Sequence, residues 1–251
     1  MHRGTFTGGP AASILPTMEA LVIVGVIAVI ALGIWWAWQA RKKRREAFAR
    51  LASQVGLTYA AEDPFGLVGL PFTLFGRGEG RGTENVLWGT WQDLDLKCFD
   101  YWYYEESTDS EGHRSRNYYR FSCAVTTLEA DCHPLTISRE NIFTRLADHM
   151  GFRDIEFELE EFNRAFQVKC KDRKFANDLV DARMIQWLLQ AGEDWSFEVA
   201  GPYVLCFSKR RRPEEMIPLL GTLQAFRGKV PGVVYSLYGT AGRGADPNPT
   251  A

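Results

Sequence analysis

The strongest pattern in the chain is an unbroken apolar run from Met18 to Trp38. As a helix, these residues extend about 31 Å, which matches the hydrocarbon core of a bilayer, about 30 Å thick. The only charged residue, Glu19, lies in the first turn at headgroup level, and the last turns carry Trp35 and Trp36, which begin an aromatic belt. The run therefore predicts a single transmembrane helix. Two alternatives fit less well, because a cleaved signal peptide carries its basic residues before a shorter apolar region, and because nothing else in the chain would bury so uniformly apolar a helix.

Five basic residues follow this run, namely Arg41, Lys42, Lys43, Arg44 and Arg45. Residues 1–17 carry only Arg3 and the α-amino group as positive charges, so the positive-inside bias places the N-terminus outside and the C-terminal domain in the cytoplasm. The basic run needs no role beyond setting this topology. As a lipid-binding patch it would attract anionic headgroups by about 1 kcal/mol per charge. A second basic run would join it if the fold brings that run to the membrane, and it consists of Lys209, Arg210, Arg211 and Arg212.

Beyond the span the helical pattern continues to a capping Gly56, with Ala47, Leu51 and Val55 at i, i+4 and i+8, which predicts a helical stalk over residues 39–56. From Leu57 the period changes to two, which indicates strands. The strands expected first are Leu57–Ala60, Pro71–Phe75, Glu84–Gln92, Leu94–Tyr104 and Tyr118–Leu128. The last two form a long hairpin whose polar loop, Glu105–Asn117, is expected to be a mobile tip.

The register of this hairpin follows from its two faces. One face becomes wholly apolar if Phe99, Tyr101 and Tyr103 stand opposite Cys123, Phe121 and Tyr119. The other face then carries Asp100, Trp102, Arg120 and Ser122. A shift by one residue would set Cys98 against Cys123 but would mix polar and apolar residues on both faces, so no disulfide is expected there.

The second half alternates short strands and helices. The expected strands are Leu135–Ser138, Asp154–Glu160, Phe162–Lys169, and the hairpin pair Trp195–Ala200 and Tyr203–Ser208 around Gly201 and Pro202. The expected helices are Arg139–Met150, a region from the N-cap Asp172 to Gln190 with a break near Asp181, and Glu214–Arg227 with Pro218 in its first turn. Pro231–Tyr238 is expected to be a final strand or an ordered tail. The strand Asp154–Glu160 would carry an acidic outer stripe, which keeps an exposed strand soluble or, less simply, binds a divalent cation or a basic partner.

These elements predict an α+β fold: one N-terminal transmembrane helix followed by a cytosolic antiparallel-sheet domain with three or four helices. The expected bounds are a flexible extracytoplasmic segment at 1–17, the span at 18–38, the stalk at 39–56, the domain at 57–239 and a disordered tail at 240–251. Gly33 and Ala37 have the spacing at which two spans pack closely, which hints at a homodimer.

Composition narrows the partners. The chain of 251 residues has a net charge of −2, but residues 1–45 hold six of its 29 Lys and Arg and one of its 31 Asp and Glu. The remaining 23 basic and 30 acidic residues make the domain mildly acidic, which argues against nucleic acid as a partner. The five cysteines are widely spaced and form no CxxC pair, so they are expected to be reduced and mostly buried.

No motif for catalysis, a cofactor or a metal is found, so none of these sites is assigned. The glycines from Gly76 to Gly82 follow an expected strand as a phosphate loop would, but they lead into another strand and no Gly-Lys-Ser/Thr follows, so they are expected to form a flexible loop. Cys132 and His133 are adjacent and would point oppositely on a strand, although Pro134 allows a turn that would pair them as nucleophile and base.

The segment Phe157–Leu189, together with LPFTLF near Pro71 and FDYWYY near Asp100, resembles a family of uncharacterised bacterial membrane-anchored proteins with a domain of unknown function. The matching positions are Glu161, Phe162, Asn163, Phe166, Val168, Asp172, Ala176, Leu179 and Leu188. The resemblance implies an anchored α+β domain and supplies no activity. Asn163 is most simply a turn or capping residue.

The sequence therefore favours a non-enzymatic interaction or scaffold domain, anchored in the bilayer and working on an unknown membrane or cytosolic protein or on lipid at the inner surface. The alternative is a membrane-anchored enzyme, or a lipid- or small-molecule-binding domain, whose site is built from scattered residues such as Asp100, His133 and the acidic stripe. Two titratable groups converging in a deep pocket would favour the enzyme.

Overall fold

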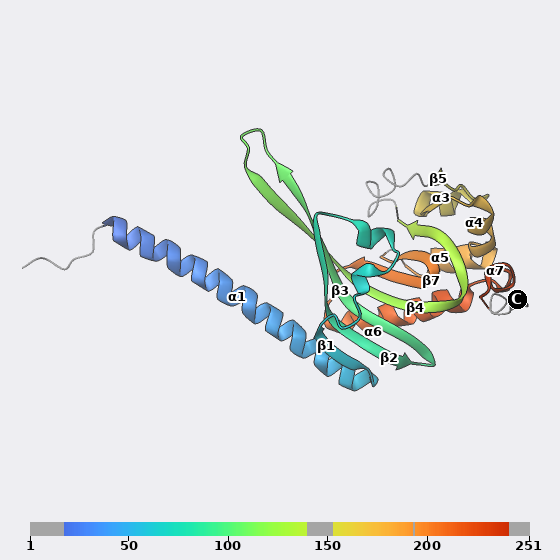
Figure 1. Ribbon diagram of the computed structural model, residues 1–251, viewed down its shortest axis with the longest axis horizontal. Coiled ribbons are helices and arrows are strands. Elements are labelled where there is room, and N and C mark those ends of the chain that lie inside the picture. Colours follow the sequence, from blue (N-terminus) through green and yellow to red (C-terminus); the bar gives the residue numbers. More distant parts are fainter. Residues whose placement is uncertain (1–17, 140–152, 193, 241–251) are drawn as a thin grey trace, which may run out of the picture. The chain divides into compact units, whose positions relative to one another are not determined.

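The computed structural model describes residues 18–139, 153–192 and 194–240. The fold is α+β, as predicted: one long apolar N-terminal helix precedes an antiparallel-sheet domain (Figure 1). The chain divides into two compact units, residues 1–44 and 45–251, which are described separately. The expected helix Arg139–Met150 and most of the two expected flexible ends lie outside the described residues.

Helix α1 runs without a break from Met18 to Val55. It is long and apolar enough to cross a membrane, and its large apolar side chains from Met18 to Trp38 are each more than half exposed. The helix ends as expected before Gly56, whose φ of 73° suits glycine, and the Leu57 amide donates to the Ala52 carbonyl at 2.9 Å. In the second unit, Phe48, Leu51 and Ala52 are buried. Residues 45–55, expected as part of a stalk, therefore pack as part of the domain.

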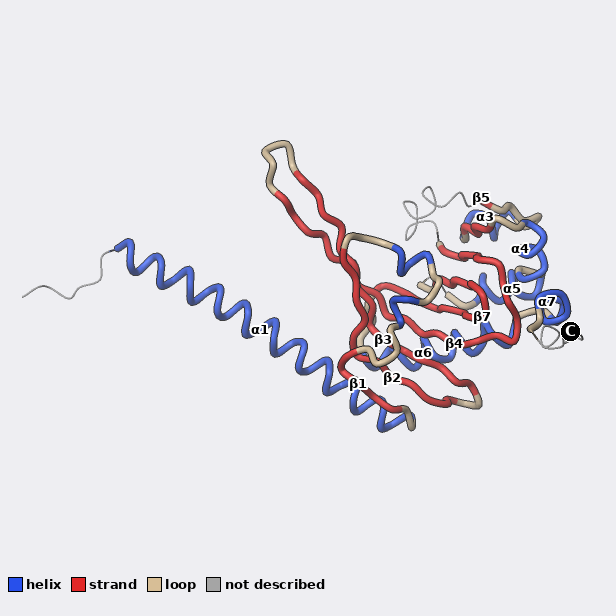
Figure 2. Tube along the Cα trace, viewed as in Figure 1, coloured by secondary structure: helices blue, strands red, loops and turns tan. Residues whose placement is uncertain are grey.

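Among the described residues, seven strands form one antiparallel sheet, shown in red in Figure 2. They are β1 (Thr58–Glu62), β2 (Gly80–Trp91), β3 (Leu94–Thr108), β4 (Arg114–Ser138), β5 (Arg153–Asp154), β6 (Gln167–Cys170) and β7 (Ser196–Lys209). The path is β1-β2-β3-β4-β6-β5, and β7 lies along the other edge of β4. Strand β4 thus pairs with β3, β6 and β7 and connects the two halves of the sheet.

The predicted hairpin register is confirmed, because Phe99, Tyr101 and Tyr103 pair with Cys123, Phe121 and Tyr119. All five cysteines are free and buried, as expected, and Cys98 lies opposite Ala124. The predicted loop Glu105–Asn117 is too long, since the two strands extend into it and stay paired as far as Thr108 and Arg114. Cross-strand pairs, such as Arg116 Nε to Glu106 Oε1 at 2.9 Å, let this polar segment form a ribbon.

Other strand predictions differ from the structure. Pro71–Phe75 contains a 3₁₀ turn, and the expected strand Phe162–Lys169 begins as a helix, because residues 160–165 are helical and the strand runs from Gln167 to Cys170. Pro231–Tyr238, expected as a final strand or an ordered tail, contains a helix. Asp154–Glu160 is strand only at Asp154, and its Leu159 is 42% exposed instead of facing the core. The hairpin expected around Gly201 and Pro202 is one continuous strand. Gly201, with a φ of 55°, bends the strand, and pairing with β4 continues on both sides of it.

The helices of the domain are α3 (Glu160–Ala165), α4 (Arg173–Leu179), α5 (Ala182–Gln190), α6 (Met216–Lys229) and α7 (Gly232–Tyr238). The predicted break near Asp181 is confirmed, because the side chains of Asp172 and Asp181 accept hydrogen bonds from the Phe175 and Met184 amides at 3.1 and 2.8 Å. Phe226 of α6 stacks on Phe197 of β7 at 4.4 Å between ring centroids. The pair lies in the core between the helices and one face of the sheet.

The opposite face of the sheet is covered by residues 63–79, which we call the strap. It contains the 3₁₀ turns η1 (Leu67–Gly69) and η2 (Thr73–Gly76), and it packs Leu67, Phe72 and Phe75 into a second core. Because the strap belongs to no ladder, side chains from the sheet satisfy its backbone groups. The Tyr101 hydroxyl donates to the Leu74 carbonyl at 3.0 Å, and Arg81 donates to the Gly78 carbonyl at 2.9 Å.

Glu198 of β7 is the central anchor of the strap. Its carboxylate accepts hydrogen bonds from the Thr73 amide at 2.6 Å and the Leu74 amide at 3.0 Å, and the residue is 2% exposed. Burial raises the pKa of this carboxyl to about 7, and the two amide donors oppose that rise. A group that changes charge near neutral pH therefore holds the strap to the sheet.

Candidate functional site

The first predicted basic run lies on α1. Arg41, Lys42 and Lys43 are exposed, and the Lys42 ammonium lies 5.5 Å from the centroid of the Trp38 ring. The boundary between the two units falls inside the run, between Arg44 and Arg45. Its contact with lipid stays a prediction.

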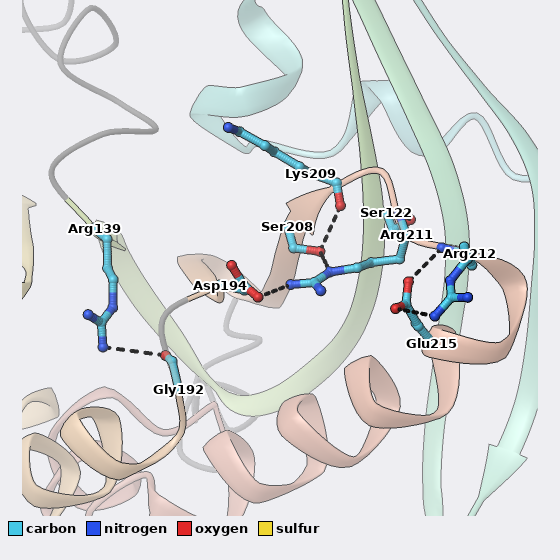
Figure 3. A network of polar contacts seen from close by, with 9 residues as sticks. All are labelled: Ser122, Arg139, Gly192, Asp194, Ser208, Lys209, Arg211, Arg212 and Glu215. Atoms are coloured by element: carbon cyan, nitrogen blue, oxygen red, sulfur yellow. Dashed lines mark hydrogen bonds and ion pairs between the residues drawn. The ribbon is translucent and has the colours of Figure 1, made fainter.

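The second basic run follows the end of β7, and its three arginines lie beside carboxylates of the same chain. Figure 3 shows Arg211 and Arg212 with their partners. Arg210 approaches Glu84 and Asp100 at 3.8 Å, Arg211 pairs with Asp194 at 2.7 Å, and Arg212 pairs with Glu215 at 3.1 Å. In Figure 3 the side chain of Lys209 extends away from these pairs, and its ammonium makes no ion pair with any described residue. These partners reduce the charge that the run offers to a membrane.

Asp100 belongs to a buried polar network at a β-bulge. Asn85, with a φ of 56°, donates to the Asp100 carboxylate at 2.9 Å and accepts from the Tyr59 hydroxyl at 3.1 Å. The bulge lies between Glu84 and Leu87, where the β2–β3 register shifts. The network satisfies buried polar groups at this irregularity, which is a structural role.

His133 lies elsewhere on β4, with its Nε2 atom 3.6 Å from Asp172 and its ring against Phe175 and Tyr238. The structure does not bring His133 to Asp100. Burial raises the pKa of the neighbouring Cys132 thiol to about 12, which keeps the thiol protonated and poorly nucleophilic at neutral pH. Among the described residues, no group of three or more His, Cys, Asp or Glu side chains is placed to hold a metal ion.

The feature that sequence reasoning missed is an aromatic surface on the β3–β4 ribbon. Pairing with β2 ends at Tyr104 and pairing with β7 ends at Phe121, but β3 and β4 stay paired as far as Thr108 and Arg114. The ribbon projects beyond the rest of the sheet (Figure 1). We call residues 102–120 the arm.

One side of the arm carries three aromatic rings and two arginines that contact them. We call this surface the aromatic face, and it consists of Trp102, Tyr104, Tyr118, Arg116 and Arg120. The Trp102 and Tyr104 rings are stacked at 6.5 Å between centroids, and the Tyr118 ring lies 5.4 Å from the Tyr104 ring. The guanidinium groups of Arg116 and Arg120 lie over Tyr104 and Tyr118 at 4.7 and 5.2 Å. Tyr118 is 47% exposed.

Glycines in β2 make room for these rings. Gly80 and Gly82 pair with Tyr104 and Trp102, so the two rings lie over the β2 backbone. A Cβ atom at Gly80 would lie 2.3 Å from the Tyr104 ring, and one at Gly82 would lie 2.9 Å from the Trp102 ring. The expected flexible glycine loop is therefore partly strand, and its glycines serve close packing.

Comparison with known proteins tests the fold. No family model and no curated protein matches the chain, so the resemblance to an uncharacterised membrane-anchored family stays a prediction. Among solved structures, the crystal structure of the mycobacterial trehalose monomycolate transport factor A, TtfA, aligns with a TM-score of 0.55. The two proteins share a fold. The alignment covers 75% of this chain and 93% of TtfA at 12% sequence identity, so the similarity to TtfA concerns the fold alone.

The sequence contained a usable signal for the aromatic face. Trp102, Tyr104 and Tyr118 alternate with the apolar positions that the hairpin register buries, so the register puts all three on the face where Trp102 and Arg120 were expected. That face was expected to be partly polar. The structure adds that the rings and the two arginines gather on the part of the ribbon that extends past its neighbouring strands.

Proposed function

We propose that this protein is a membrane-anchored, non-enzymatic interaction domain whose arm docks a protein partner at the inner surface of the membrane. The aromatic face carries this proposal. Tryptophan, tyrosine and arginine are the residues most enriched at the centres of protein interfaces. Tryptophan and tyrosine bury a large area with few rotatable bonds, and the arginine guanidinium stacks on aromatic rings while it donates hydrogen bonds. On the arm, all three types form one stacked surface that is still partly exposed.

The topology of the proposal rests on α1. Its apolar half supports anchoring, and the basic run Arg41–Arg45 supports a cytoplasmic domain by the positive-inside bias. The similar fold of TtfA, which is named as a transport factor, is consistent with an auxiliary role in a membrane process. A catalytic role receives no comparable support, because Asp100 and His133 have separate structural partners.

In-cell photo-crosslinking of the full-length protein tests the proposal. A photoreactive amino acid at Tyr118 is expected to give a discrete crosslinked product, and one at the exposed Gln190 of α5 is not. Adding Trp102→Ala to the Tyr118 probe should reduce the product at least tenfold, since loss of an interface hot spot costs about 2 kcal/mol or more. Adding Leu237→Ala, which removes an exposed apolar residue of α7, should leave it unchanged.

Equal crosslinking from Tyr118 and Gln190, or insensitivity of the product to Trp102→Ala, would show that the arm does not dock a partner. Mass spectrometry of the product separates a different protein from a second copy of this chain. If the product contains only a second copy of this chain, the arm mediates self-association and does not dock a different protein.

A further inference from the structure

A cleft of about 500 Å³ lies between the strap and the sheet. Trp88 of β2, Lys97 of β3 and Val125 of β4 are direct cross-strand neighbours, so they lie on one face of the sheet and form its floor. Further apolar lining comes from Phe65, Leu67 and Leu70 of the strap and from Tyr203 of β7. The volume and the mainly apolar lining are typical of small-molecule sites.

The polar groups of the cleft are few and lie at separate places. The Lys97 ammonium lies 5.0 Å from the centroid of the Phe65 ring, and it makes no ion pair with any described residue. Asp95 also lines the cleft, but its carboxylate accepts a hydrogen bond from the Thr90 hydroxyl on the neighbouring strand. Since Asp95 and Lys97 are two positions apart on β3, their backbones are separated by about 7 Å.

We propose that this cleft binds a long-chain carboxylate, with the carboxylate on the Lys97 ammonium and the acyl chain between the strap and the sheet. Charge complementarity selects the headgroup, because a lysine beside aromatic rings in a partly desolvated mouth attracts an anion more strongly than a lysine in open water. Asp95 repels the same headgroup and so favours the Lys97 end of the cleft. The walls are mainly apolar, so an acyl chain that enters the cleft is removed from water.

Photoaffinity labelling of the full-length protein in phosphatidylcholine nanodiscs tests this site. The probe is palmitic acid with a diazirine on its chain, and the matched comparison is hexadecanol with the same diazirine. The acid is expected to label peptides from the strap and from β2, to be displaced by excess palmitate, and to label these peptides about tenfold more than the alcohol does.

Lys97→Glu should remove the preference for the acid and reduce labelling in the cleft about tenfold. Lys209→Glu, a charge reversal at an exposed lysine outside the cleft, should label like the wild-type protein. Leu70→Glu, in the wall of the cleft, provides a second variant that should also abolish labelling. Circular dichroism confirms that each variant is folded.

Several outcomes would overturn the proposal. Labelling confined to α1 would mean that the probe only partitions into the bilayer. Equal labelling by the acid and the alcohol would show that the cleft does not recognise a carboxylate. Equal labelling of the Lys97→Glu variant and the wild-type protein would show that Lys97 does not bind it. The inference is independent of the docking role, because Trp102→Ala should lose the crosslinked partner and keep full labelling of the cleft.

Discussion

Replacing Glu198 by Gln should remove most of the pH dependence of folding stability between pH 5 and pH 8. The pKa of the carboxyl is about 7 in the folded protein and 4.5 in its ordinary state, so the folded protein binds more protons than the unfolded chain in this range. Stability from this group is fully present below about pH 4.5 and is lost as the pH rises through 7.

The magnitude follows from the pKa difference. At about 1.4 kcal/mol for each tenfold change in proton affinity, the full effect is about 3 kcal/mol, of which about 2.5 kcal/mol falls between pH 5 and pH 8. Desolvation of the buried Glu198 carboxylate is the main cause of the pKa difference. The lowered pKa values of Asp178 and Glu215 concern the range below their ordinary values and leave the slope above pH 5 unaffected.

The measurement is urea unfolding of the detergent-solubilised full-length protein, followed by tryptophan fluorescence at four pH values from 5 to 8. The wild-type free energy of unfolding should fall by about 2.5 kcal/mol across this range, and the Glu198→Gln variant should show a nearly flat profile. Glu214→Gln, at an exposed carboxyl on the same domain, should keep the wild-type slope. A wild-type slope in the Glu198→Gln variant would refute the reasoning, because another group would then be responsible for it.

Three further predictions follow from packing and charge. Gly78→Ala should destabilise the domain by about 2 kcal/mol or more in thermal unfolding, because Gly78 has a φ of 67° and its new Cβ would lie 2.3 Å from the Tyr104 carbonyl. The control Gly69→Ala places its Cβ in open space and should be nearly neutral. Equal melting temperatures for the two variants would contradict the packing around Gly78. The five cysteines are buried, so native protein at pH 8 should resist iodoacetamide and react fully in urea; rapid native alkylation would show an open core. A fragment of residues 39–239 should bind anionic vesicles more tightly than a fragment of residues 46–239, because the arginines of the second basic run are already paired with carboxylates. Cosedimentation measures the binding, with neutral vesicles as the control. Equal binding of anionic vesicles by the two fragments would mean that the second basic run, and not the first, contacts the lipid.

Local patterns predicted the features that depend on local physics. The N-cap Asp172 and the break near Asp181 were foreseen, because each cap needs only a side chain and an amide three residues later. The hairpin register was also foreseen, because a shift by one residue would have exposed the whole apolar set of Phe99, Tyr101 and Tyr103.

The errors arose where distant partners decide the conformation. The strap reads as a strand from its apolar alternation, yet it is held by Glu198, more than a hundred residues later in the chain. Gly201 and Pro202 are typical turn residues, but the register with β4 keeps them within one strand. The outer part of the arm, Glu105–Asn117, was predicted as a loop from its polar composition, because cross-strand pairs such as Glu106 with Arg116 leave no local signal. The cleft was not predicted for the same reason, because its two walls, the strap and the sheet, come together only in the folded domain.

The pairing of β4 constrains how the protein is made on the ribosome. One edge of this strand is covered by β3, which is synthesised before it, but its other edge is covered from Phe121 to Ile137 by β7, which ends at Lys209. After β4 has emerged, about seventy more residues must be translated before that edge is covered. During that interval this long strand has an open edge, and such an edge pairs readily with other chains. Slow translation between residues 140 and 195 would prolong this exposure, whereas a chaperone that holds the nascent edge would shorten it.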